Sequence, residues 1–160
     1  MISEPQFREI RSDDMQAIFD VRIATWDNDR GDEELAQLGI THASVREMLQ
    51  NSHRGWLCEV DAQVVGFAIG NRVTGEMWVI SVLKEYEGKG IGKQLIHLVE
   101  EWLFQQGWQE IWLTTYPDET VRAVGFYRHL GWRDWKLEPG GDRFMKKHWA
   151  DCVGDYRVRQ

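Results

Sequence analysis

Residues 87–93 form a glycine-rich turn, Glu-Gly-Lys-Gly-Ile-Gly-Lys, between an apolar strand-like segment and an amphipathic helix-like segment. Three glycines at alternate positions let the backbone turn tightly and approach a ligand closely, because glycine has no Cβ. The first N–H groups of the following helix have no intrahelical partners and carry the positive end of its dipole. With Lys89 and Lys93 beside them, these groups are typical of a diphosphate site. A flexible loop without a ligand is the alternative.

Two common nucleotide-binding motifs do not fit this turn. The Walker pattern needs Ser or Thr directly after its lysine, whereas Gln94 follows Lys93. The dinucleotide pattern G-x-G-x-x-G needs two residues before its last glycine, whereas one residue separates Gly90 from Gly92. The sequence therefore favours neither a Walker-type nor a dinucleotide site.

The elements that must position this turn can be predicted from residue types and periodicity. Seven segments rich in β-branched and aromatic residues are predicted strands. They are Phe7–Arg11, Trp56–Val60, Val64–Ile69, Met77–Val82, Trp108–Thr114, Trp132–Leu137 and Arg143–Lys146. Four helices are predicted from apolar spacing: one that follows an N-cap at Ser12, and Ala43–Gln50, Ile91–Gln106 and Thr120–Leu130.

A polar, acidic loop (Asp27–Glu34) is expected between the first two helices. The resulting order is βααβββαβαββ. This order predicts a mixed α/β (α+β) domain, with an antiparallel meander followed by a central βαβ unit.

Two separated motifs resemble the signatures of the GNAT superfamily (GCN5-related N-acetyltransferases). The family carries [QR]-x-x-G-x-[GA] between its fourth strand and third helix, and residues 87–92 match it with Glu87 in place of Gln or Arg. The second signature, roughly N-x-x-A-x-x-[FL]-Y-x-x-x-G-[FW], has Thr120 in place of Asn. Its other positions are met by Ala123, Phe126, Tyr127, Gly131 and Trp132. The resemblance covers about residues 7–147.

The resemblance implies one N-acetyltransferase domain over residues 1–160, with 148–160 as a C-terminal tail. The expected fold is a splayed, mixed and mostly antiparallel sheet of about seven strands with four flanking helices. Acetyl-CoA would be the co-substrate, with its pantetheine arm paired along the fourth strand and its diphosphate on the turn. The cofactor-binding residues implied are Ile80, Ser81, Val82, Glu87, Gly88, Lys89, Gly90, Ile91, Gly92, Lys93, Thr120 and Tyr127.

Tyr127 and Glu76 are the catalytic residues that the resemblance implies. Acetyl transfer to an amine requires a proton to leave the amine and a proton to reach the departing thiolate. Tyr127 matches the family's usual proton donor, and a phenol with a pKa near 10 can return a proton to a thiol. Glu76 matches a glutamate that some members use as base, directly or through water, and a backbone N–H near Val82 would stabilise the thioester oxygen. The alternatives are a core tyrosine and an ordinary strand-initiating glutamate.

The acceptor site is the least specified part of the resemblance. The loop between the first two helices and the fifth strand give Trp26, Asp27 and Thr115 as substrate-binding candidates. Acidic loop residues would attract a cation, and Trp26 or Trp135 could cover it; a solvated acidic loop is the alternative. We expect direct attack by a small primary amine in a ternary complex. A protein or peptide amine, or a non-catalytic acetyl-CoA-binding sensor, are the alternatives.

Composition limits the remaining classes. A chain of 160 residues fits one domain, and a net charge of −7 argues against nucleic acid as a partner. Cys58 and Cys152 show no metal-ligand spacing and suggest reduced thiols, so no metal is expected. The N-terminus lacks signal-peptide features and no apolar run reaches 18 residues. We therefore expect a cytoplasmic protein without a membrane partner; a homodimer is compatible with the sequence.

Overall fold

The computed structural model of the protein describes residues 3–25 and 32–152. Within these residues, one sheet has the strand order β1-β2-β3-β4-β5-β7-β6. The strands are β1 (Gln6–Glu9), β2 (His53–Val60), β3 (Gln63–Asn71), β4 (Glu76–Val82), β5 (Glu110–Thr115), β6 (Arg133–Leu137) and β7 (Arg143–His148). Neighbouring strands are antiparallel except β4 and β5, which are parallel. The predicted mixed, mostly antiparallel sheet of seven strands is confirmed.

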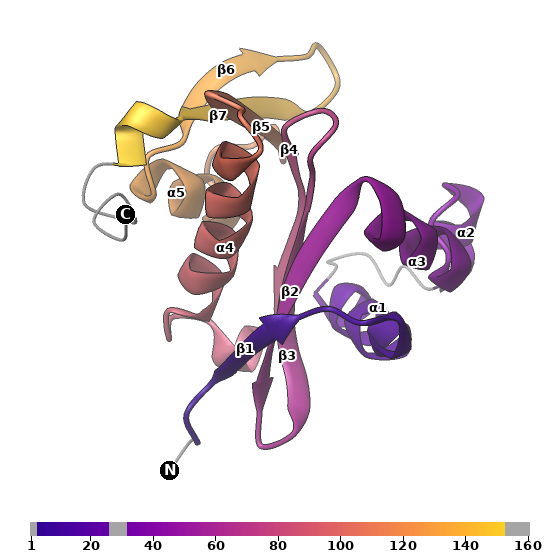
Figure 1. Ribbon diagram of the computed structural model, residues 1–160. Helices are drawn as coiled ribbons and strands as arrows, with labels where there is room; N and C mark the ends of the chain where they lie inside the picture. Colours follow the sequence, from indigo (N-terminus) through magenta and orange to yellow (C-terminus); the bar gives the residue numbers. More distant parts are fainter. Residues whose placement is uncertain (1–2, 26–31, 153–160) are drawn as a thin grey trace.

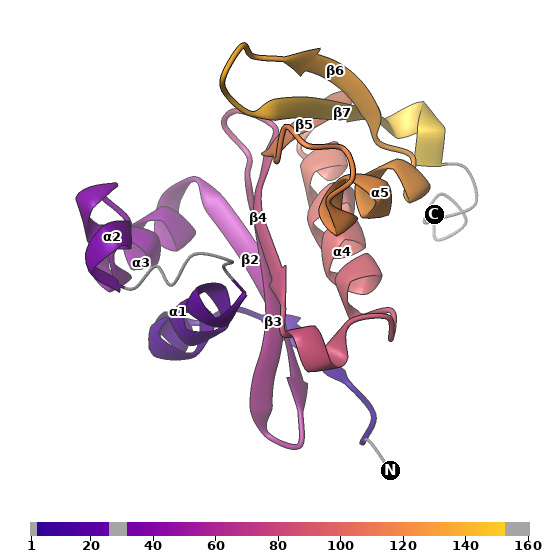
Figure 2. The same cartoon turned by 180° about the vertical axis from the view of Figure 1, so that it is seen from behind.

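Helices cover both faces of this sheet (Figures 1 and 2). One face carries α1 (Met15–Ala24), α2 (Asp32–Gln37) and α3 (His42–Asn51). The other carries α4 (Ile91–Gln105) and α5 (Arg122–His129). Short 3-10 turns span Ser12–Asp14, Lys84–Tyr86 and Trp149–Cys152. The last turn lies in the segment expected as a tail, and its Cys152 is buried.

Two details of the helical prediction were wrong. The described residues contain five α-helices rather than four, because α2 begins at Asp32 inside the stretch expected as a loop. Leu35 of α2 is buried in the apolar core on this face of the sheet. This contact stabilises a helix in a segment whose polar composition alone suggests a solvent-exposed loop. The first helix begins at Met15 rather than directly after Ser12, because the Asp14 carboxylate accepts the backbone N–H of Arg11 and organises a 3-10 turn there.

Each face of the sheet has its own apolar core. Leu95, Val99 and Leu103 follow one another along α4 at helical spacing and are fully buried against the sheet. Gly70 of β3 permits this contact, because a Cβ at that position would lie 2.6 Å from a methyl carbon of Val99. The second core lies between the sheet and α1, α2 and α3.

The sheet is splayed between β4 and β5. These strands pair at one register position, Glu76 opposite Trp112, and diverge beyond it. Two indole N–H groups hold the closed end: Trp112 donates to the carbonyl of Thr74 (2.9 Å) and Trp108 to that of Arg72 (2.7 Å). The divergence leaves the rest of β4 facing an opening.

Candidate functional site

A cleft of about 700 Å³ lies where β4 and β5 diverge. One wall is the run Met77–Val82 of β4, and the opposite wall is the run Thr114–Tyr116 at the end of β5. The remaining lining residues come from several other elements. They are Arg22, Thr25, Glu87, Ala123, Tyr127 and Asp142. The cleft therefore joins both arms of the sheet with α1 and α5.

The edge of β4 in this cleft presents main-chain groups. Leu83 donates its N–H to the carbonyl of Val65 on the β3 side, and in an antiparallel pair such inward-bonding residues alternate. The main-chain N–H and C=O groups of Ser81 therefore bond to β3, while those of Ile80 and Val82 point into the cleft. Beyond Glu76, no described strand pairs with this edge. An extended ligand can add there as a strand would.

Ser81 is a polar group in the cleft wall that lacks a partner. Its side chain is buried, and its Oγ has no hydrogen-bond partner among the described residues. Ser81 lies opposite Phe67 across β3 and β4, and directly opposed side chains share one face of a sheet. Because a buried unpaired hydroxyl costs about 1–3 kcal/mol, this group suits a ligand that supplies the missing hydrogen bond.

The turn before α4 has the backbone geometry that its glycines predict. Gly88 and Gly90 have φ values of 75° and 84°, a region that side chains disfavour, and Gly90 is the N-cap of α4. A Cβ at Gly92 would lie 3.3 Å from the Phe126 ring, so this glycine allows α4 to pack closely against α5. Glu87 ends the cleft and pairs with Arg122 (3.3 Å), which offsets its negative charge beside the turn.

Tyr127 of α5 lines the cleft. Its side chain is 7% exposed, and burial raises the pKa of the phenol above its usual range. The positive charge of Arg22 opposes this rise, and Tyr116 adds to it. The phenol is therefore protonated at neutral pH and can act as a donor.

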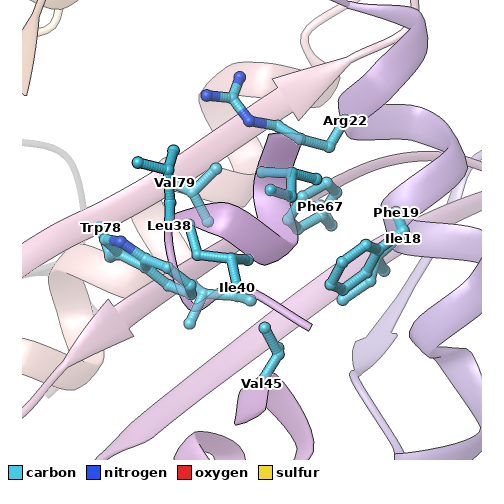
Figure 3. Close-up of a pocket in the computed structure, with 11 residues that line it drawn as sticks. Ile18, Phe19, Arg22, Leu38, Ile40, Val45, Phe67, Trp78 and Val79 are labelled. Atoms are coloured by element: carbon cyan, nitrogen blue, oxygen red, sulfur yellow. The ribbon is translucent and has the colours of Figure 1, made fainter. Parts of the chain in front are cut away.

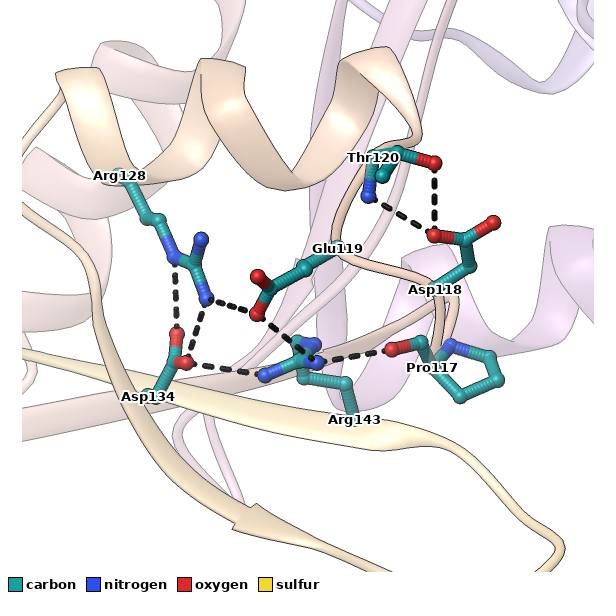
Figure 4. Close-up of polar contacts among 7 residues, drawn as sticks. All are labelled: Pro117, Asp118, Glu119, Thr120, Arg128, Asp134 and Arg143. Carbon is teal, nitrogen blue, oxygen red and sulfur yellow. Dashed lines mark hydrogen bonds and ion pairs between the residues drawn. The ribbon is translucent and has the colours of Figure 1, made fainter.

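A network of charges holds α5 in place (Figure 4). Arg128 of α5 donates to Asp134 of β6 at 2.6 and 3.2 Å, and Arg143 of β7 donates to the same carboxylate at 2.9 Å. Arg143 also donates to the carbonyl of Pro117 (2.8 Å) in the loop that precedes α5. The loop, the helix and two strands are thus joined around the segment that presents Tyr127.

The structure brings six of the sixteen expected site residues together in the cleft. These are Ile80, Ser81, Val82, Glu87, Thr115 and Tyr127. The turn from Gly88 to Lys93 follows Glu87 outside this lining, and the Ile91 side chain is buried in the core, so that residue can offer only its main chain. Thr120 also lies outside the lining, where its N–H and Oγ1 bond to Asp118 (2.9 and 2.7 Å).

Glu76 lies outside this group of residues. Glu76 lies at the closed end of the splay, outside the cleft lining but directly before Met77, which lines it. Burial raises the pKa of the Glu76 carboxyl. Trp26 and Asp27 fall outside the described residues.

Five polar residues of the cleft were not among the predicted site residues: Arg22, Thr25, Thr114, Tyr116 and Asp142. The available signal was the position of Arg22, which continues the core-facing spacing of α1 after Ile18. An arginine on that face has to meet a polar site or solvent at its tip. Tyr116 follows β5 without any local pattern that marks it.

Comparisons with known proteins agree with this geometry. The sequence model of the acetyltransferase (GNAT) family matches residues 7–132. An uncharacterized N-acetyltransferase of Chlorobaculum tepidum is 26% identical over 69% of this chain and 66% of its own length. One of Methanocaldococcus jannaschii is 34% identical over 52% of this chain and 55% of its own. The chain thus spans less than two thirds of these relatives.

The crystal structure of the PaiA N-acetyltransferase of Thermoplasma acidophilum in complex with coenzyme A has the same fold. It superposes with a TM-score of 0.79 at 17% identity, over 92% of this chain and all of that one. Residues 3–25 and 32–152 contain no helix long and apolar enough to span a membrane, and no group of three or more His, Cys, Asp or Glu side chains that could hold a metal ion.

Proposed function

Since the chain belongs to the GNAT acetyltransferase family, we propose that it transfers an acetyl group from acetyl-CoA to a primary amine. One observation carries this proposal: the free edge of β4, the end of the glycine turn and Tyr127 meet in one cleft. The acceptor attacks directly while both substrates are bound. Such an arrangement gains from proximity, because the bound amine and thioester react as one unit.

Two features of the chain suit acetyl-CoA, which supplies the acetyl group as a thioester. The N–H groups at the start of α4, with Lys89 and Lys93, hold the diphosphate. The main chain of Ile80 and Val82 pairs with the pantetheine arm. The coenzyme A bound to the PaiA structure, which shares this fold, supports the assignment.

Tyr127 and the Val82 N–H perform the transfer. The N–H donates a hydrogen bond to the thioester oxygen as negative charge develops there, a contribution of about 3–4 kcal/mol. The amine nitrogen forms an amide bond to the acetyl carbon while the carbon–sulfur bond breaks. Tyr127 then gives its proton to the departing sulfur, which its protonated, buried phenol is suited to do.

Glu76 accepts the proton that the amine releases. Because Glu76 lies outside the cleft lining, the proton travels through a bridging water. Its raised pKa makes the carboxylate a stronger base than an exposed glutamate. Asp142, which lines the cleft directly, is the competing candidate.

Release of CoA in the presence of amines tests the proposed reaction. Acetyl-CoA and the protein are mixed with polyamines, aminoglycosides, amino acids and peptides, and thiol release is followed together with product mass. We expect one acetylated amine per CoA released. Acetylation confined to peptides would favour a protein or peptide amine as acceptor. If the protein binds acetyl-CoA but releases no free CoA with any amine, the proposed enzymatic activity is wrong and a sensor is favoured. The departures from the family motifs at Glu87 and Thr120 would fit a sensor.

A further inference from the structure

A second cavity, of about 210 Å³, lies on the face of the sheet that carries α1, α2 and α3. Its lining residues are aliphatic or aromatic apart from Arg22, which lies at one end of the group, opposite Val45 (Figure 3). Among the described residues that line it there is no Asp or Glu. An apolar cavity of about 150 Å³ can hold benzene, so this one can take a group as large as phenyl.

The cavity adjoins the cleft proposed for acetyl transfer. Trp78 and Val79 of β4 line both spaces. A register shift between β3 and β4 explains their position, because Ile69 pairs with Val79 whereas Gly70 pairs with Met77. Trp78 is the extra residue, so Trp78 and Val79, although adjacent in sequence, both pack on the α1–α3 side.

Ser81 places a polar group at the border of the two spaces. Ser81 lies opposite Phe67 across β3 and β4, and directly opposed side chains have Cβ atoms about 4.5–5.5 Å apart. Phe67 lines the cavity, whereas Ser81 lines the cleft. The Ser81 side chain is buried, and its Oγ has no hydrogen-bond partner among the described residues. This hydroxyl can therefore bind the polar end of a ligand whose apolar part fills the cavity.

We propose that the acceptor is a primary amine joined by a short chain to a phenyl or alkyl group, without a second charge. The apolar group occupies the cavity, and the amine lies in the cleft, where its N–H donates a hydrogen bond to the Ser81 Oγ. This substrate class rests on the proposed acetyl transfer. A polyamine or an aminoglycoside would have to place a further ammonium group among apolar side chains, where an unpaired charge is costly.

Two matched pairs of amines test the substrate class through the rate of CoA release. Hexylamine and 1,5-diaminopentane have chains of equal length and differ by an ammonium group in place of a methyl group. We expect kcat/KM for hexylamine to exceed that for the diamine by about 10-fold or more. The value for 2-phenylethylamine should exceed that for ethylamine by about 10-fold or more, because the phenyl group fills the cavity. Equal values within the pairs, or a preference for the diamine, would overturn the proposal.

A peptide that begins with phenylalanine presents the same amine and phenyl group on a larger molecule. Its kcat/KM should be lower than that of 2-phenylethylamine, because the rest of the peptide has to be accommodated outside the cavity. Faster turnover of the peptide would contradict a small acceptor and indicate a peptide N-terminus instead.

Two variants test the cavity. Leu38→Asp places a carboxylate on an exposed residue of the cavity lining and should reduce the preference for hexylamine over 1,5-diaminopentane. Leu137→Asp, on an exposed residue of β6, is the control and should leave this preference unchanged. Val45→Phe fills part of the cavity and should lower the rate with 2-phenylethylamine but not with ethylamine. Because Val45 is buried and its variant can fail to fold, Leu38→Asp decides: unaltered selectivity in this variant would contradict the placement.

Ser81→Ala tests the contact with the amine. The value of kcat/KM for 2-phenylethylamine should fall about 5-fold, the scale of one hydrogen bond. CoA affinity should change little, because the main chain of Ser81 remains paired with β3. The midpoint of thermal unfolding should not fall, since the Oγ has no protein partner to lose. A lower midpoint with unchanged kcat/KM would show a structural hydroxyl and overturn this contact.

Product binding separates this proposal from the proposed reaction. If no amine is acetylated, the acetyl transfer fails, and N-(2-phenylethyl)acetamide is titrated calorimetrically in the presence of CoA. Binding that Val45→Phe or Leu38→Asp weakens, and that Leu137→Asp does not, would support the cavity as the site of the apolar group. Absence of binding to the wild-type protein would overturn the cavity assignment too.

Discussion

On the α4 flank of the cleft, the groups proposed to hold acetyl-CoA belong to the main chain; on the flank of α1 and α3, side chains line the neighbouring cavity. The first flank consists of the turn 87–93 and the edge of β4 at Ile80 and Val82. The second takes residues such as Phe19, Val45 and Arg22 from separate elements. A site built from main-chain groups needs closely spaced glycines and so leaves a motif in the sequence. A side-chain pocket collects residues that are far apart and leaves none.

The two arms of the sheet differ in a related way. The β1–β4 arm is covered by apolar cores on both faces. In the β5–β7 arm, Lys147 of β7 and Glu100 of α4 form a fully buried ion pair at 3.1 Å. Trp132 donates its indole N–H to the same carboxylate (2.8 Å). This arm, which carries Tyr127, should therefore be more sensitive to the loss of one charge.

Lys147→Met should have the largest effect on stability. Removing Lys147 takes a buried positive charge away from the Glu100 carboxylate, and we expect a loss of about 3–5 kcal/mol in the free energy of unfolding. Lys146→Met, one residue earlier on the opposite face, is the control and should cost less than about 1 kcal/mol. Denaturant unfolding measures both. Adding Glu100→Gln to Lys147→Met should recover part of the lost stability. Equally small losses of stability in Lys147→Met and Lys146→Met would contradict the greater sensitivity of the β5–β7 arm to the loss of one charge.

Glu76→Gln should lower kcat by about 10²-fold, the scale of a lost general base. Glu76 acts as a carboxylate and its pKa is raised by burial. In the wild-type protein, kcat should therefore fall as pH drops through a value above the usual range of glutamate, and the variant should lose this acid limb. Asp142→Asn is measured in parallel. If Asp142→Asn rather than Glu76→Gln removes the limb, the base lies on the β5–β7 arm.

Gly90→Val should weaken CoA binding by about 10-fold or more, because a branched side chain obstructs the approach to the turn. The Gly107→Val variant is the control for backbone strain, because Gly107 also has a positive φ. Gly107 follows α4 at its other end with φ 103° and open space around it, as Gly90 has with φ 84°. Calorimetry should show unchanged CoA affinity for Gly107→Val. Equal losses in the two variants would mean that strain, not ligand contact, explains the effect.

Lys89→Gln/Lys93→Gln should have the smallest effect, a few-fold loss of CoA affinity at low salt. Both lysines are exposed, so their attraction for phosphate is screened within about 10 Å at 0.1 M salt. The double variant should flatten the fall in affinity as salt rises, whereas Lys136→Gln/Lys146→Gln on the β6–β7 hairpin should not. If the CoA affinity of the Lys89→Gln/Lys93→Gln variant still falls steeply with salt, other residues supply the positive charge that attracts the phosphates.

The sequence alone predicts the main-chain elements better than the side-chain pocket. The strands, α4 and the turn follow from periodicity and from glycines at 88, 90 and 92, since local backbone chemistry determines them. The helix α2 was missed because a single tertiary contact, through Leu35, outweighs its polar composition. The position of Arg22 in the cleft was missed because it depends on the convergence of α1, β4 and α5, which no local pattern records.

The turnover of Tyr127→Phe tests the central claim most directly, because phenylalanine keeps the buried ring and removes the proton. Its packing against Phe126 and Trp132 should persist, so folding and CoA affinity should change little. We predict that kcat and kcat/KM fall together by about 10²-fold or more, as expected for an interaction made mainly in the transition state. A folded variant that binds CoA and retains full kcat would contradict the assignment of Tyr127 as the proton donor in acetyl transfer.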